Sequence, residues 1–169
     1  MIPILNKISK TLSNILVNIA AVSLIFWVVI IVVFVVARAV FNVNWMFVEE
    51  YTGYGMVLLA SFSFAYALRR GAHVRVTAIA ENIPGKIQKP LCVLADLVGF
   101  IVAVYLTRHG IQWLIHGIEG GQRSWFPSRT LLWPVYALIP IGLGALSIEF
   151  LNQLLMNLCR FRQGGGAQK

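Results

Sequence analysis

Residues 15–37 form a run of 23 in which no side chain is charged. A helix needs roughly 20 apolar residues to cross a hydrocarbon core about 30 Å thick, whereas the apolar centre of a cleavable signal peptide is about 7–15 residues long. Lys7 and Lys10 precede the run, as basic residues precede a signal sequence, but the run is too long for one. It therefore predicts a retained membrane-spanning helix.

The composition extends this prediction to the whole chain. Of its 169 residues, 59% are hydrophobic and 12% are charged, against roughly 45–50% and 25% in soluble globular domains. A soluble domain and a disordered chain are both excluded. The net charge of +8 would favour nucleic-acid binding only if the basic residues shared an exposed face. Here they lie at the ends of apolar runs, which indicates membrane topology and no nucleic acid.

Three further apolar segments follow the first. We expect one all-α integral membrane domain over residues 1–169, with four transmembrane helices and short amphipathic helices at the membrane surface. The expected spans are 15–37, 50–68, 90–107 and 131–158, the expected amphipathic stretches are 2–14 and 108–119, and the expected disordered tail is 163–169.

The two amphipathic stretches differ in their polar faces. In 2–14, Ile8 and Leu12 lie on one side and Lys7 and Lys10 lie opposite, as in an interfacial helix. In 108–119, one face is polar and the other apolar, so this helix either extends the third span outward or lies along the outer membrane surface. Its polar face consists of Arg108, Gln112, His116 and Glu119.

Basic residues predict the orientation. Ten of the fourteen Lys and Arg residues lie at the two termini or between the second and third spans. Because basic residues favour the cytoplasmic side, both termini are predicted to be cytoplasmic. The other four, in the first and third connections, are Arg38, Arg108, Arg123 and Arg129.

Two acids, Asp96 and Glu149, lie within the expected spans near the inner boundary. An intramembrane acid faces protein or water, so each could relay protons or ions, or pair with a basic side chain. We favour structural pairing because basic residues lie at the same level. The candidate partners of Glu149 are Arg69 and Arg70. Those of Asp96 are Arg75, Lys86 or a basic residue of another subunit.

The outer start of the second span is also acidic. Glu49 and Glu50 lie there, where the helix macrodipole favours acids, and Arg38 ends the first span at the same depth. We expect a local cap and ion pair, with docking of a basic partner as the alternative.

The sequence lacks catalytic and metal-binding patterns. His109 and His116 fall outside and His73 inside, without acidic or cysteine ligands at metal spacing. Cys92 and Cys159 both fall on the inner side, which excludes an enzyme that makes disulfides through reactive outer cysteines. With no nucleophile–base set, we predict a non-enzyme with no cofactor or metal in this chain.

Two of the expected spans carry small residues that permit close helix contact. We expect them to form helix interfaces, within this chain or with a partner subunit. These residues are Ala60, Ser63 and Ala67 in the second span, and Pro140, Gly142 and Gly144 in the fourth.

Two motifs accompany the four spans. One comprises Trp45, Glu49-Glu50-Tyr51, Ala65-Tyr66-Ala67-Leu68-Arg69-Arg70-Gly71 and His73-Val74-Arg75-Val76, and the other comprises Leu132-Trp133-Pro134-Val135-Tyr136 and Ile139-Pro140-Ile141-Gly142. Over roughly residues 15–158 the chain resembles the small, DctQ-type membrane subunit of tripartite ATP-independent periplasmic (TRAP) transporters. Thr77 departs from this pattern, since the family often has an acidic residue there.

The resemblance implies a multi-pass protein of a bacterial inner membrane. Family members pair with a large multi-span subunit that holds the substrate and sodium sites and moves as an elevator. A periplasmic binding protein delivers an organic acid, such as a C4-dicarboxylate or sialic acid. The chain would then be a scaffold for the large subunit and part of the docking surface, with Arg108, Arg123 and Arg129 as docking residues.

One expectation follows from this function: Asp96→Asn should impair assembly or yield rather than sodium coupling. The alternative function is a self-sufficient small homo-oligomeric transporter or channel, and it would need a polar line through the membrane midplane, which the sequence does not show.

Overall fold

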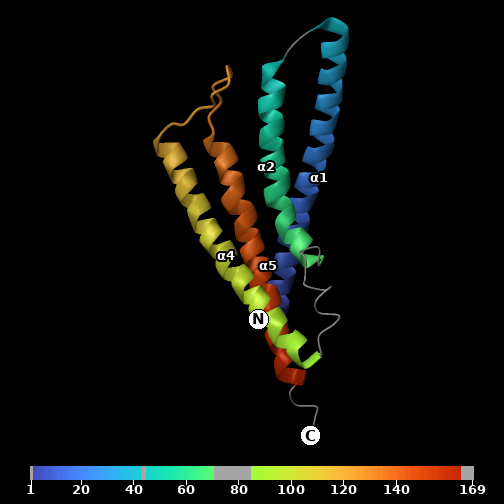
Figure 1. Ribbon diagram of the computed structural model, residues 1–169, viewed down its shortest axis with the longest axis vertical. Helices are drawn as coiled ribbons and strands as arrows, with labels where there is room; N and C mark the ends of the chain where they lie inside the picture. Colours follow the sequence, from blue (N-terminus) through green and yellow to red (C-terminus); the bar gives the residue numbers. More distant parts are fainter. Residues whose placement is uncertain (1, 43–44, 71–84, 165–169) are drawn as a thin grey trace.

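Four long helices make up most of the chain. The computed structural model describes residues 2–42, 45–70 and 85–164. The start of α1 and the end of α5 lie toward one end of the bundle, which we call the terminal end. The loop between α4 and α5 lies toward the other end, which we call the loop end (Figure 1). The helices are α1 (Ile2–Phe41), α2 (Met46–Arg69), α4 (Gly85–Glu119) and α5 (Trp133–Gly164).

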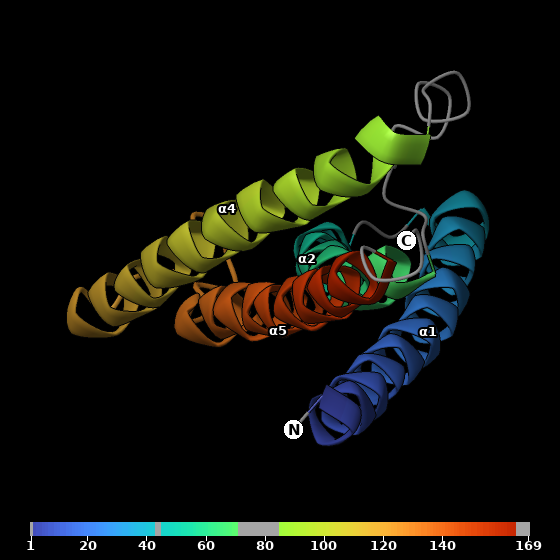
Figure 2. The same cartoon turned by 90° about the horizontal axis from the view of Figure 1, so that it is seen from below.

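The helices pack in a row rather than in a square. α4 packs on α5, α5 packs on α2, and α1 packs on α2 and more lightly on α5. Seen from below, α4 and α1 lie on opposite sides with α2 and α5 between them (Figure 2). An apolar core joins α1, α2 and α5, and its buried members are Leu16, Ala20, Phe62, Ala65 and Ala145.

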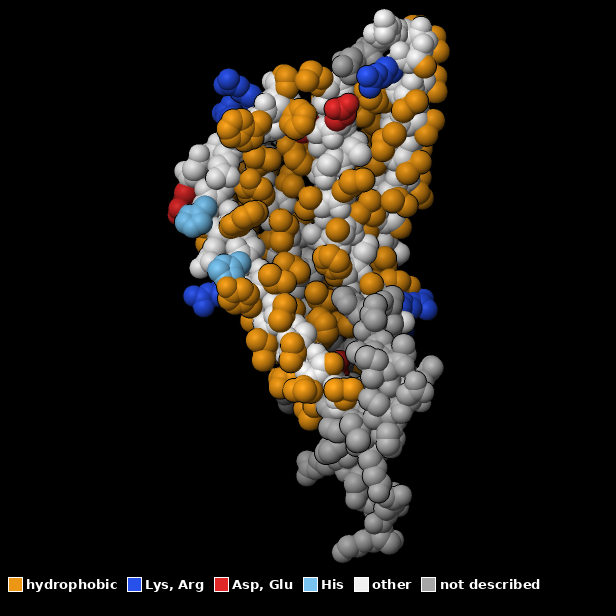
Figure 3. Space-filling model, viewed as in Figure 1, with side chains coloured by type: hydrophobic (Ala, Val, Ile, Leu, Met, Phe, Trp, Pro, Cys, Tyr) orange, Lys and Arg blue, Asp and Glu red, His pale blue; other side chains and the backbone are white. Residues whose placement is uncertain are grey.

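The outer surface of the bundle is strongly apolar. Along α1, Val22, Phe26 and Val29 are 69%, 58% and 56% exposed, and a helix that is apolar all round fits a membrane rather than water. Apolar side chains cover most of the described face in Figure 3, with charged side chains at its edges.

Three of the helices are long and apolar enough to cross a membrane within the described residues: Asn6–Phe41, Val93–Glu119 and Trp133–Cys159. They correspond to the first, third and fourth expected spans. α2 is 24 residues long, but its acidic start, its basic end and its serines and glycines lower its apolar character. The span expected at 50–68 therefore stays a prediction.

The two expected surface helices are not separate elements. Stretch 2–14 is continuous with the first span in α1, and 108–119 is the last third of α4. In the first turns of α1 it is Ser9 and Ser13 that face the bundle, at 1% and 2% exposure, while Ile8 is 55% exposed. The apolar side chain of Ile8 therefore points away from the bundle, and an interfacial position of this stretch stays a prediction. α5 runs to Gly164, so residues 163 and 164 of the expected tail are helical, and residues 165–169 lie outside the described ranges.

Small residues set the level at which the helices cross. A methyl group at Gly142 of α5 would overlap the backbone carbonyl of Ser61, so glycine lets α5 touch the α2 backbone there. A methyl group at Gly110 of α4 would lie 3.5 Å from Pro140. Ser61 is about two-thirds of the way along α2 (Met46–Arg69). The region around Gly110 in α4 is therefore level with a part of α2 about 12 Å before its end at Arg69.

Candidate functional site

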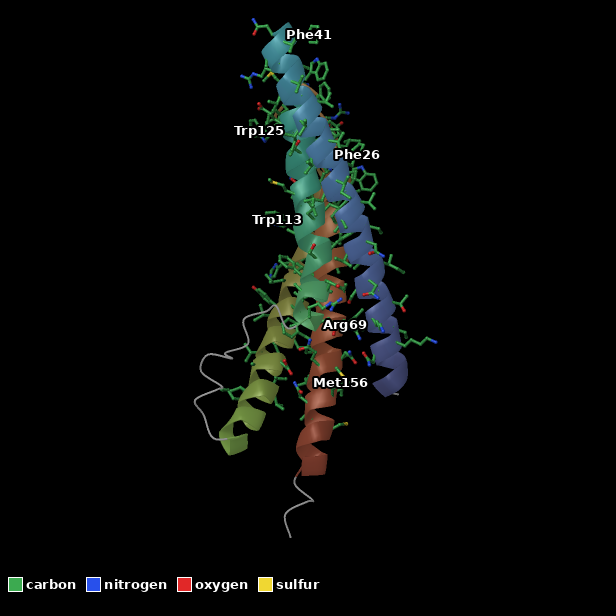
Figure 4. The ribbon with its side chains drawn as sticks, turned by 90° about the vertical axis from the view of Figure 1, so that its right-hand side faces the viewer. Phe26, Phe41, Arg69, Trp113, Trp125 and Met156 are labelled. Atoms are coloured by element: carbon green, nitrogen blue, oxygen red, sulfur yellow. The ribbon has the colours of Figure 1, made fainter. Side chains whose placement is uncertain are left out.

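Glu149 is the centre of a polar cluster at the terminal end. Its carboxylate is 1% exposed and lies 3.5 Å from Nη1 of Arg69. Ser9 Oγ donates a hydrogen bond to the same carboxylate oxygen, Oε2. Asn6 Oδ1 accepts hydrogen bonds from Arg69 Nη2 at 2.7 Å and from Asn152 Nδ2 at 3.3 Å. This inner cluster ties α1, α2 and α5 together, and Arg69 is labelled in the lower half of Figure 4.

Only one of the two arginines expected to pair with Glu149 does so. Arg70 is exposed, and its Nε donates to Tyr66 Oη at 2.9 Å on its own helix. Its guanidinium also lies over the Tyr66 ring, 5.2 Å from the ring centroid. Arg69 therefore supplies the positive charge of the inner cluster.

Asp96 makes a second link at the terminal end. It is 9% exposed, and Asn157 Nδ2 of α5 donates a hydrogen bond to its Oδ2. The expected partner Arg75, like the side chain of Lys86, lies outside the described residues. The sequence does not predict Asn157 as this partner, because an amide on another helix produces no pattern near Asp96.

Glu50 is the centre of an outer cluster at the loop end. It is 3% exposed, its Oε1 accepts a hydrogen bond from Tyr54 Oη at 2.6 Å, and its Oε2 accepts one from Ser128 Oγ. Tyr51 Oη and Thr130 Oγ1 lie 3.1 Å apart and form another hydrogen bond. The outer cluster fastens the loop between α4 and α5 to α2.

The ion pair expected between Arg38 and the acids of α2 is wrong. Arg38 and Glu49 are both exposed, and neither takes part in an ion pair within the described ranges. Glu50 points instead toward the loop, where hydroxyl groups meet it. The acid is satisfied by a segment 78 positions away in sequence, which no local pattern indicates.

The small residues of α5 serve contacts inside the chain. Gly142 faces the α2 backbone, a methyl group at Gly144 would lie 3.9 Å from Thr107 of α4, and Pro140 lies against Gly110. On α5 the expected helix interface therefore lies within this chain. On α2, Ala60 is exposed, and Ser63 and Ala67 are half-buried, so a subunit contact there stays a prediction.

The loop between α4 and α5 has a defined shape. Arg123 pairs with Leu131 as an antiparallel bridge, and Ser124 N donates to Thr130 O at 2.9 Å. At its tip Trp125 is fully exposed. Arg123 and Arg129 are exposed on the same loop.

Arg108 does not join the two loop arginines. It lies eleven residues before the end of α4 at Glu119, which is about 16 Å along a helix. The structure therefore separates the three arginines expected to form one docking surface into a loop pair and a residue on the side of α4.

Arg108 belongs instead to a polar stripe on α4 formed with Gln112 and His116. All three side chains are exposed, and their spacing of four places them on one helix face. His116 also lines a pocket of about 310 Å³ with Trp113, Gln122 and Tyr136. The sequence predicted the polar face, but not the pocket, which needs α5 and the loop.

Two comparisons with known proteins bear on these features. Residues 7–160 match the family described as "Tripartite ATP-independent periplasmic transporters, DctQ component". The ectoine TRAP transporter small permease protein TeaB of Halomonas elongata is 22% identical over 158 residues, covering 92% of this chain and 80% of the relative.

Proposed function

The chain belongs to the DctQ component family of tripartite ATP-independent periplasmic transporters, and on that premise we propose that it is the scaffold subunit of a sodium-coupled importer of organic acids. The small permease subunit is an inner-membrane protein of a transporter, not an enzyme.

The scaffold role is supported chiefly by how the buried acid Glu149 is used. It contacts Arg69 and Ser9 at a junction of three helices, so its charge stabilises the packing of these helices. Between the inner and outer clusters the core of α1, α2 and α5 is built from apolar residues such as Phe62 and Ala65. Such a core joins helices and offers little to a polar substrate.

We place the subunit in the bacterial inner membrane with four spans, α1, α2, α4 and α5, and both termini in the cytoplasm. The large multi-span permease subunit is its partner in the membrane and holds the substrate and sodium sites. The periplasmic binding protein docks at the loop end, where Arg123 and Arg129 are exposed beside Trp125. TeaB is named for ectoine; for this system we propose an organic acid, a C4-dicarboxylate or an acidic sugar such as sialic acid.

The test is uptake by proteoliposomes that hold the large subunit, with and without this chain, supplied with binding protein and a sodium gradient. Uptake of a labelled acid should require all three proteins and sodium. Transport by this chain alone, or full uptake in its absence, would contradict the scaffold role.

Docking of the binding protein at the loop has its own test. At limiting binding protein, Arg123→Glu and Arg129→Glu should each lower uptake. Unchanged uptake would contradict docking at the loop.

A further inference from the structure

We propose that the polar stripe of α4, made of Arg108, Gln112 and His116, is the surface on which the large permease subunit packs inside the membrane. The inference rests on the proposed function, and it assigns one helix face to the partner. The occupant is a membrane-embedded helix of the large subunit that presents a carboxylate or carbonyl oxygens to Arg108.

Most of the stripe faces away from the rest of its own chain. Ala103 and Gly117 are buried against neighbouring helices, and Gly110 lies against α5. On a helix of 3.6 residues per turn, Arg108 and Gln112 lie opposite that packed face. His116 lies at the edge of the stripe, where it also lines the pocket with Tyr136 of α5. In Figure 3 the two described histidines, both on α4, lie along the left edge of the molecule.

The stripe also lies at membrane depth. Arg108 is near the middle of the membrane-length segment Val93–Glu119. Through Pro140 and Gly142 of α5, this part of α4 is level with Ser61, about 12 Å before the end of α2 at Arg69. Trp113, which lies between Gln112 and His116 in the sequence, is labelled below the exposed apolar Phe26 of α1 and above Arg69 (Figure 4).

Lipid tails cannot form hydrogen bonds with the polar side chains of the stripe. An arginine in the centre of a span is costly in hydrocarbon and faces protein or water. Gln112 and His116 add further donors and acceptors on the same exposed face, and lipid tails cannot satisfy them. Arginine binds carboxylates through two parallel hydrogen bonds, so a partner helix with an acidic or carbonyl group at this level fits the stripe.

The same face continues toward the terminal end as an apolar strip. Leu94, Val98 and Ile101 are 56%, 52% and 58% exposed. From Leu94 to His116 the face is about 33 Å long, close to the thickness of a hydrocarbon core. A partner helix can therefore lie along α4 across the membrane, with apolar contacts at one end and polar contacts in the middle and at the other.

The proposal is tested with a photo-crosslinking amino acid placed at Gln112 in the full complex in membranes. The matched control is Val22, an exposed apolar position of α1. The probe at Gln112 should crosslink to the large subunit, and the probe at Val22 should not. Crosslinks from the probe at Gln112 only to lipid or to a second copy of this chain would overturn the proposal. Labelling of Gln112→Cys in the complex by a membrane-impermeant thiol reagent would also overturn it.

A variant gives a second readout. Arg108→Ala should lower recovery of the large subunit by about tenfold or more, because its partner is left buried and unpaired. The thermal stability of this chain alone should not change, since Arg108 is exposed on it; Val22→Ala is the control. Failure of the large subunit to co-purify with the unaltered chain would contradict the proposed function itself. Normal co-purification and uptake without a crosslink from Gln112 would overturn only this inference.

Discussion

Two buried glutamates, one at each end of the bundle, are held in different ways. Glu149 is 1% exposed and has a positive partner, Arg69, in a cluster that joins three helices. Glu50 is 3% exposed and accepts hydrogen bonds from the hydroxyls of Tyr54 and Ser128, with no cation beside it among the described residues. The first contact fixes helices to each other, and the second fixes a loop to one helix.

The difference predicts how each cluster fails. Removing one member of a buried ion pair leaves an uncompensated charge, which is strongly destabilising. Removing an acceptor from hydroxyl groups near the surface allows those groups to turn to water. Damage at Glu149 should therefore unfold the bundle, whereas damage at Glu50 should release the loop.

The largest effect is expected for Arg69→Met. Glu149 would then be buried without its cation, and we expect the free energy of unfolding to fall by about 3–5 kcal/mol. Thermal unfolding of the purified chain in detergent measures this. The control is the double variant Arg69→Met/Glu149→Met, which removes both charges and should recover much of the loss. Equal losses in the single and double variants would show that the pair is not the cause.

The next effect is expected at the crossing between the two clusters. Gly142→Ala places a methyl group against the Ser61 backbone, so α2 and α5 must separate, at a cost of about 1–3 kcal/mol. Both clusters should then become more mobile, as measured by hydrogen exchange at their residues. The matched control is Gly53→Ala, where the methyl group meets nothing, and helix formation should improve slightly. Equal stability of the two variants would contradict the close crossing.

A smaller and local effect is expected for Glu50→Ala. The hydroxyls of Tyr54 and Ser128 lose their acceptor but can turn to water, so we expect a cost of about 0.5–1.5 kcal/mol. Faster hydrogen exchange should be confined to the loop and the start of α2. Glu50→Gln retains an acceptor oxygen and should lose less. Global unfolding comparable to that of Arg69→Met would contradict the distinction between the two glutamates.

The smallest effect is expected for Tyr51→Phe. Its hydrogen bond to Thr130 is exposed at 3.1 Å, so water can replace it, and we expect at most about 0.5 kcal/mol. Hydrogen exchange at Thr130 is the measurement. A loss as large as that of Glu50→Ala would show that Tyr51, not Glu50, holds the loop.

The sequence predicted those features of the fold that depend on a single segment of the chain. Uninterrupted apolar runs predicted the helices, and helix rise placed Glu149 at the level of Arg69. The partner of Glu50 was not predictable, because Ser128 reaches it only through the path of the loop. Asn6 and Ser9 were missed for a similar reason, since their inward orientation depends on the acid and arginine of other helices.

The position of Arg108 shows the same limit. Its charge suggested that the third span ends at residue 107, yet α4 continues unbroken to Glu119. The level of Arg108 relative to α2 is set by the contacts of Gly110 with Pro140 and of Gly142 with Ser61. Such contacts set the position of each helix along its axis relative to its neighbours. The sequence of a single helix does not contain that information.

The central claim is that the buried charges of this subunit hold the scaffold together and do not couple transport to sodium. The most direct test is uptake by the reconstituted transporter with the double variant Arg69→Met/Glu149→Met, at a range of sodium concentrations. The account predicts that uptake per assembled complex keeps the sodium dependence of the unaltered transporter. A complex that assembles at normal yield but has lost its sodium dependence would contradict the account.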